Sequence, residues 1–364
     1  MKRGMTLEAL GLALAEQEEA KQDYLVDSNR LRMESGGFPP VLRVLDQAGE
    51  DCMEPMELNA TAHRQLGGYL RIPASYYGRM LQEDPELLAH NVNRWLNDVQ
   101  EPKLMRTMNG TVRALLSNRY WCVDHLELLR VAGPVFDQIP GLTVRSCGLT
   151  ESRMYVEVIN QRLQQDVVPG DTVQYGIIIT NSEVGMGAIS IQPLIYRLVC
   201  TNGMVVSKRF GSGTHRIHKG SVLPLSGPMC SYEAPGLDGQ QKTVTDIRKR
   251  LTDAIQGAKF EIILEQMRRA TEVAIEAEDV PALLKEVGAA VGIREAEQEG
   301  VLRHLLANHD MTQYGLANAV TRYAQDVISY DRATELEAAG YDLMTMPRRQ
   351  WTHFNEMAAI SVAA

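Results

Sequence analysis

The sequence predicts an α+β fold in which an antiparallel sheet of β-hairpins packs against a long helix. Three observations support this class. Val173, Tyr175, Ile177 and Ile179 alternate along one face of the strongest strand pattern in the chain. Residues 103–117 read as a hairpin, and a helical stripe of apolar residues begins near residue 243. We expect a helical unit on the N-terminal side of this core and a helical region on its C-terminal side.

Residues 1–100 form the first expected segment, which is mixed but mainly helical. A helix over residues 6–22 precedes strands at 24–33 and 41–45, with the break at 36–40 rich in Gly and Pro. Three helices then begin at capping signals, which are Asn59, Ile72-Pro73 and Asp84-Pro85. The spacing of Tyr69, Tyr76, Tyr77 and Trp95 in these helices favours packing over base stacking.

Residues 101–270 form the expected core. Asn109-Gly110 is a two-residue hairpin turn within 103–117, and a helix follows over 122–138. Strands at 141–147, 153–159, 173–179 and 188–200, with a turn at Asn202-Gly203, complete a single sheet of about four to six strands. A helix of about 30 residues from Thr243 would cross this sheet.

Residues 271–364 form the C-terminal helical region. The apolar periodicity predicts helices over residues 280–287, 294–308 and 312–330. The acidic stretch 272–279 is typical of a solvated surface.

Composition limits the class of protein. The 364 residues are 45% hydrophobic, and no run of about 18 apolar residues predicts a membrane span. Acidic residues in the first helix argue against a signal peptide. The five cysteines form no CxxC pair, which indicates a reducing, cytosolic compartment.

Charge is distributed unevenly along the chain. The formal net charge is −9, and residues 1–60 and 261–300 each carry a net −6. By contrast, no Asp or Glu occurs from Val184 to Tyr232. Basic side chains beside Gly-rich backbone are a common arrangement for holding phosphates. The alternative interpretation is that a buried hairpin simply avoids carboxylates.

We predict that the basic side chains of this region line a groove for nucleic acid. Arg106 and Arg113 lie on the two arms of the 103–117 hairpin and would add to the groove, with Tyr120 or Trp121 stacking on a base. The predicted nucleic-acid-binding residues are Arg106, Arg113, Arg119, Tyr120, Arg197, Lys208, Arg209, Arg216 and Lys219.

Motifs for catalysis are weak. His215 and His218 form an HxxH that could share a metal ion, but a third ligand at fixed spacing is missing. The Gly-rich residues 210–214 lack the GxxxxGK[ST] pattern of a phosphate loop, and no GxSxG occurs. We therefore expect no catalytic residues, no cofactor, no metal and no enzymatic activity.

Several segments together resemble a phage/plasmid-like family of unknown function. They are residues 72–77, the run Asn91–Trp95, residues 113–120 with sequence RALLSNRY, and residues 197–204 with sequence RLVCTNGM. The resemblance covers roughly residues 20–270 and implies an origin in phages, prophages or plasmids. It implies no activity.

The order of elements is also similar to that of single-strand annealing recombination proteins of the RecT, Erf and Rad type. Those proteins form rings or helices of subunits that hold single-stranded DNA in a basic groove. We therefore expect an oligomeric, non-enzymatic, cytoplasmic protein that binds and anneals single-stranded DNA.

Two other functions are compatible with the sequence. One is a protein-interaction or anti-defence assembly factor that binds no nucleic acid and works through its acidic segments. The other is a nuclease-like or nucleotide-processing enzyme that uses the two histidines.

Overall fold

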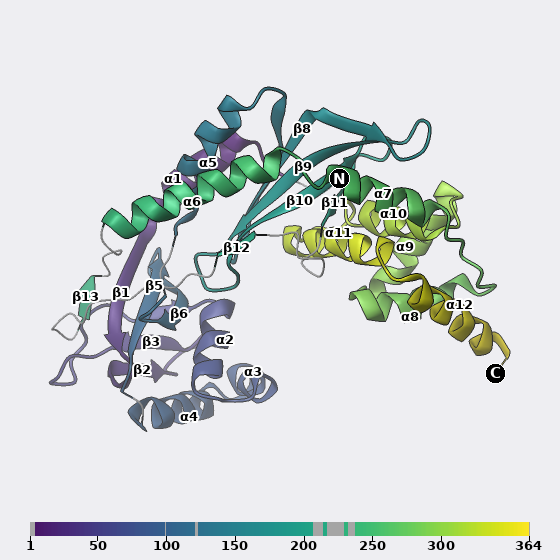
Figure 1. Ribbon diagram of the computed structural model, residues 1–364. Helices are drawn as coiled ribbons and strands as arrows, with labels where there is room; N and C mark the ends of the chain where they lie inside the picture. Colours follow the sequence, from purple (N-terminus) through teal and green to yellow (C-terminus); the bar gives the residue numbers. More distant parts are fainter. Residues whose placement is uncertain are drawn as a thin grey trace.

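The computed structural model describes residues 4–98, 100–120, 123–206, 214–216, 229–231 and 237–363. The fold is α+β, as the sequence predicts, with two antiparallel-rich sheets and helices at both ends (Figure 1). None of the described helices is long and apolar enough to cross a membrane.

The first sheet lies in the N-terminal part of the molecule and has the order β13-β1-β5-β6-β4-β3-β2. All its neighbouring strands are antiparallel except β4 and β6. Its strands are β1 (Lys21–Asp27), β2 (Leu31–Glu34), β3 (Val41–Val44), β4 (Met56–Leu58), β5 (Pro102–Met108), β6 (Thr111–Ser117) and β13 (Met229–Ser231), with a 3-10 turn η1 (Ser28–Arg30) after β1. Three helices pack against it, which are α2 (Ala60–Tyr69), α3 (Ala74–Glu83) and α4 (Pro85–Asp98).

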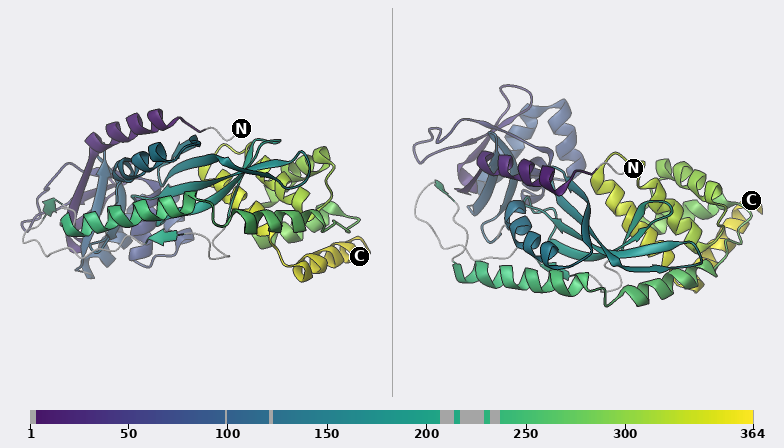
Figure 2. Two further views of the ribbon diagram at one scale, coloured as in Figure 1. Left: turned by 45° about the horizontal axis from the view of Figure 1, so that its top comes forward. Right: turned by 90° about the horizontal axis from the view of Figure 1, so that it is seen from above.

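The second, central sheet has the order β11-β10-β9-β8-β7, with β12 also paired to β10. Its strands are β7 (Leu142–Leu149), β8 (Met154–Asp166), β9 (Thr172–Asn181), β10 (Ile189–Arg197), β11 (Asn202–Val205) and β12 (Thr214–Arg216). Helices α1 (Leu7–Ala20), α5 (His125–Gln138) and α6 (Leu237–Ile255) run along it (Figure 2).

Alternate side chains of β9 pack on opposite faces of the central sheet, as the sequence pattern predicts. Ile177 and Ile179 belong to the core beneath α1, α5 and α6. Tyr175 packs against Phe260 of α7 (Phe260–Thr271), with ring centroids 5.6 Å apart. Ile178, on the opposite face, joins a cluster with Tyr330 of α11 (Tyr330–Met344). Both faces of the sheet are thus covered, which explains its near-continuous apolar sequence.

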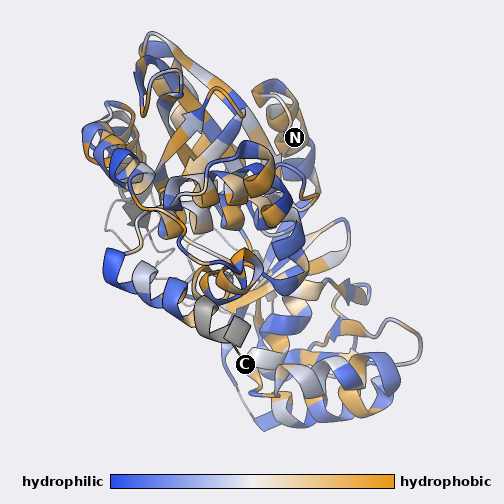
Figure 3. Ribbon diagram, turned by 90° about the vertical axis from the view of Figure 1, so that its right-hand side faces the viewer, coloured by the Kyte–Doolittle hydropathy of each residue, from blue (hydrophilic) through white to orange (hydrophobic). Residues whose placement is uncertain are grey.

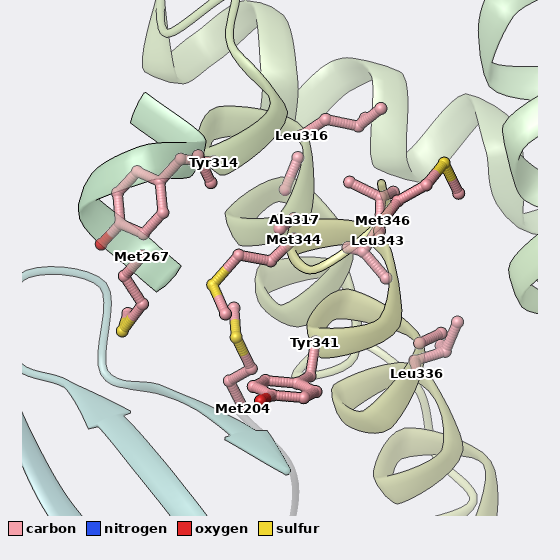
Figure 4. Packing of buried hydrophobic residues seen from close by; sticks show 14 of the residues in the cluster. Met204, Met267, Tyr314, Leu316, Ala317, Leu336, Tyr341, Leu343, Met344 and Met346 are labelled. Atoms are coloured by element: carbon pink, nitrogen blue, oxygen red, sulfur yellow. The ribbon is translucent and has the colours of Figure 1, made fainter. Parts of the chain in front are cut away.

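The C-terminal helices share one large core with the end of the central sheet. They are α7, α8 (Val280–Val291), α9 (Glu295–Asn308), α10 (Gln313–Tyr323), α11 and α12 (Arg348–Ala363). Met204 of β11 lies beside Tyr341 and Met344 of α11 in this core (Figure 4). Hydrophilic and hydrophobic residues are interspersed along the outer helices (Figure 3), as expected for amphipathic helices that cover a core.

The structure differs from the sequence prediction in sheet membership. The hairpin β5–β6 turns at Asn109-Gly110, where both residues have positive φ, as expected of that dipeptide. However, it pairs with β1 and β4 in the first sheet rather than joining the central one. A hairpin pattern fixes the pairing of its own two arms but carries no information about its outer neighbours.

Three helix and turn boundaries also differ. The helix expected from Thr243 is two helices, α6 and α7, which separate near Gly257, whose φ of +73° is left-handed. The helix expected over 312–330 ends at Tyr323. The turn expected at Asn202-Gly203 lies at residues 198–201 instead. Thr201 has the positive φ, and Asn202 is already paired with Arg197 as the first residue of β11.

Gly176 in β9 allows the closest approach between two central strands. A Cβ atom there would lie 2.1 Å from the carbonyl oxygen of Val158 in β8. We expect Gly176→Ala to lower the free energy of unfolding by about 3 kcal/mol, because backbone must move to relieve the overlap. Urea denaturation measures this change.

Gly78→Ala is the matched control, because no atom lies within 4 Å of the Cβ position in α3. Helix propensity there favours Ala by up to about 1 kcal/mol. Equal stabilities for the two variants would contradict the close packing of β8 on β9.

Candidate nucleic-acid interface

A buried carboxylate, Glu183, lies where the two sheets meet. It follows β9 in the Gly-rich loop before β10, and it is 1% exposed. Its carboxylate accepts hydrogen bonds from Lys21 Nζ of β1 at 2.7 Å and Arg113 Nη1 of β6 at 2.8 Å. It also accepts the backbone N–H of His125, the first residue of α5, at 2.6 Å. A negative charge at a helix N-terminus is favourable, because the N–H groups there lack helical partners.

Arg106 of β5 completes the cluster around Glu183. Its guanidinium donates to the carbonyl oxygen of Glu183, to Asp23 and to Asp124, each at 2.9 Å. The residue is 1% exposed. Its charge is therefore balanced inside the protein.

The cluster shifts the pKa values of its members. Burial alone would raise the pKa of Glu183, but the positive charges of Arg113, Lys21 and Arg106 outweigh it and hold that pKa far below its usual range. Burial lowers the pKa of His125 to about 4, although Glu183 opposes this shift. His125 is therefore neutral at pH 7, and its Nδ1 lies 3.1 Å from Nδ2 of Asn181.

Arg197 is a third predicted phosphate ligand whose charge is balanced internally. Its Nε donates to Asp171, and the same carboxylate accepts the hydroxyl of Tyr314 at 2.8 Å. Arg106, Arg113 and Arg197 thus each pair with a carboxylate of the protein itself. Their acidic partners precede Val184 in the sequence, so the acid-free stretch gives no sign of them.

The other predicted nucleic-acid-binding residues have no common location in the structure. Arg119 is exposed, whereas Tyr120 is half-buried and donates its hydroxyl to the carbonyl of Ser182 at 3.0 Å. The backbone of His215 and Arg216 lies in β12, opposite Ser190 and Ile189. Five other residues named in the sequence analysis lie outside the described part of the chain, namely Trp121, Lys208, Arg209, His218 and Lys219.

Three pockets that share lining residues lie between the first sheet, the central sheet and α11, and we refer to them together as the groove. The largest of these three sections has a volume of about 690 Å³ and is lined by α2, by the β7–β8 turn and by the start of α11. The turn residues 149–152 also line a second section of about 280 Å³ that reaches Glu183 and Arg113. Arg153, Asp331 and Glu335 continue into a third section of about 340 Å³ along β10.

Two arginines converge in the largest section of this groove. Arg64 of α2 approaches Met186, with Nη2 3.4 Å from its Sδ, and Arg153 donates to the carbonyl of the same residue. Both arginines line the groove. Within the described residues, neither guanidinium forms an ion pair with a carboxylate. Two guanidinium groups from separate elements are a common arrangement for holding a phosphate. The carboxylates of Glu151, Asp331 and Glu335 line the same section.

Sequence reasoning missed Arg64 and Arg153. Both lie outside the acid-free stretch, and Arg153 is two residues from Glu151. The sequence also gives no sign that α2 and the β7–β8 turn meet over the loop that holds Met186. The described residues also contain no group of three His, Cys, Asp or Glu side chains placed to hold a metal ion.

The buried neutral His125 makes stability depend on pH. In the unfolded chain its pKa returns to about 6.5, so the unfolded state binds more protons between pH 6.5 and 4. We expect the free energy of unfolding to fall as the pH decreases through this range, by on the order of 3 kcal/mol more than in His125→Gln. Urea denaturation at a series of pH values measures the difference.

His90→Gln is the control, because His90 is exposed on α4. Its pH profile should follow that of the unsubstituted protein. Parallel profiles for His125→Gln and the unsubstituted protein would contradict the burial of a neutral imidazole.

Comparison with known proteins places the chain in a family. A family profile described as "Domain of unknown function (DUF932)" matches residues 114–357, about two thirds of the chain. No curated protein and no solved structure matches this chain. The matched region includes the C-terminal helices, which the resemblance seen in the sequence covered least. The chain therefore belongs to the DUF932 family of domains of unknown function.

Proposed function

We propose that this protein binds and anneals single-stranded DNA in the groove, as an oligomer and without catalysing a reaction. The observation that carries this proposal is the convergence of Arg64 and Arg153 on Met186. Most cations near the sheet junction are paired with carboxylates, whereas Arg64 and Arg153 form no ion pair within the described structure. The carboxylates of Glu151, Asp331 and Glu335 line the same section of the groove.

Described residues of the acid-free stretch also lie next to the groove. Its strand β12 pairs with the first residues of β10, and Ser190 of β10 lines the groove opposite His215. The basic residues Lys208, Arg209, Arg216 and Lys219 all belong to this stretch. Their charge would add to that of Arg64 and Arg153, and a local positive field can hold a polynucleotide on an acidic protein.

An extended strand could contact more than one section of the groove, because the sections share lining residues. The three sections follow one another through shared residues, from the β7–β8 turn to the wall formed by α11. Proteins that bind single strands without sequence preference use such a channel with cations along it.

A second candidate function is a protein-interaction or anti-defence factor. The acidic segment 261–300 favours it, because Glu261, Glu265, Glu272, Glu276 and Glu278 are all exposed. An acidic face of this kind can bind a basic partner. Gel shifts with single-stranded and duplex oligonucleotides at low and moderate salt discriminate the two functions.

The first test removes the basic side chains of the acid-free stretch. We expect replacement of Lys208, Arg209, Arg216 and Lys219 by Ala to abolish retention on oligo-dT, because phosphate contacts supply most of the affinity. Circular dichroism and thermal denaturation should show an unchanged fold.

The matched control replaces Arg79, Arg94, Lys249 and Arg269 by Ala, four exposed cations on α3, α4, α6 and α7. This variant loses the same formal charge and should keep its retention. Unchanged retention in the first variant, or equal loss in both, would contradict a DNA-binding surface at the groove.

The second test addresses the two arginines in the groove. We expect Arg64→Gln with Arg153→Gln to reduce the slope of log Kd against log salt by about 1.4, since each lost phosphate contact contributes about 0.7 for a single strand. Fluorescence anisotropy with labelled oligo-dT between about 50 and 200 mM salt measures the slope.

The paired substitution Arg79→Gln with Arg94→Gln provides the control, because both side chains are exposed on α3 and α4. Its slope should equal that of the unsubstituted protein. A variant at Arg64 and Arg153 with an unchanged slope would remove these residues from the phosphate contacts.

A further inference from the structure

Ile328 is the most exposed large hydrophobic side chain in the described part of the chain. It is 99% exposed, whereas the next, Phe38, is 72% exposed. Full exposure of an isoleucine forgoes roughly 1.5–3 kcal/mol of burial free energy. A single exposed apolar residue needs no explanation in itself, so its surroundings decide whether it has a role.

The turn that carries Ile328 is held on both sides. Before it, Gln325 is 2% exposed and donates to Glu337 at 3.1 Å. After it, Ser329 caps α11, and the Tyr330 hydroxyl donates to Glu157 of β8 at 3.1 Å. Asp331 accepts hydrogen bonds from Ser152 and Tyr155. The exposed side chain is therefore presented by a fixed backbone.

Ile328 also lies in the groove. It lines the largest section together with Arg64, Arg153 and Met186. An apolar side chain and two cations that form no ion pair within the described residues thus face the same space, which the carboxylates of Glu151, Asp331 and Glu335 also line. This combination matches a single-stranded nucleic acid, in which charged phosphates and flat bases repeat along a chain.

We propose that Ile328 packs against a nucleobase of the bound strand and separates it from its neighbour. Apolar side chains are known to insert between base steps and unstack them. The phosphates would contact Arg64 and Arg153, which would hold the bases over α11. This inference rests on the proposed function, and it adds the residue that contacts the bases.

The test compares the affinity of Ile328→Ala with that of the unsubstituted protein. We expect Kd for oligo-dT to rise about five- to tenfold, because the lost contact is apolar. The salt slope should stay unchanged, since no phosphate contact is removed. An oligonucleotide containing 2-aminopurine should fluoresce more on binding the unsubstituted protein, because the base is unstacked, and this gain should be lost in the variant.

Two further variants complete the design. Ile328→Leu keeps the apolar contact and should retain both the affinity and the fluorescence gain. Ile262→Ala is the matched control, because Ile262 is 62% exposed on α7 and is not among the groove residues. It should behave like the unsubstituted protein.

Each outcome decides the inference. Unchanged Kd and fluorescence in Ile328→Ala would overturn it while leaving DNA binding intact. No binding of any oligonucleotide by the unsubstituted protein would overturn the proposed function, and the role of Ile328 with it. A loss of oligomer mass in Ile328→Ala without DNA, measured by mass photometry, would assign Ile328 to contacts between subunits and would also overturn the inference.

Discussion

The arrangement of the molecule depends on the buried carboxylate of Glu183. It accepts hydrogen bonds from Lys21 and Arg113 of the first sheet, although it lies in a loop of the central sheet. The same carboxylate accepts a hydrogen bond from the first backbone N–H of α5. Removing one member of such a buried cluster leaves uncompensated charge, at a cost of roughly 3–5 kcal/mol. The cluster thus fixes the orientation of the two sheets, and the groove exists because that orientation is fixed.

The same cluster explains why basic residues in this chain have different roles. Arg106 and Arg113 belong to strands that face the sheet junction, and their guanidinium groups are neutralised there. Arg64 and Arg153 lie at the rim of the junction, in a helix and a turn, where they reach the backbone or sulfur of Met186. The position of an arginine relative to the junction therefore decides whether its charge supports the fold or faces the groove.

Local patterns predicted much of the fold and little of the site. The alternation along β9, the Asn109-Gly110 turn and the cap at Asn59 are local signals, and the structure contains all of them. The Lys21–Glu183 pair joins residues 162 positions apart, so no window of sequence shows it. For the same reason the convergence of Arg64 with Arg153 could not be foreseen. The break at Gly257 was missed because apolar spacing continues on both sides of it.

The segment between β11 and α6 contributes one short strand to each sheet. Strand β12 pairs with β10 of the central sheet, and β13 pairs with β1 of the first. Each of these strands has three residues. The two sheets are therefore joined at a second place along the sequence, through backbone pairings that do not involve Glu183.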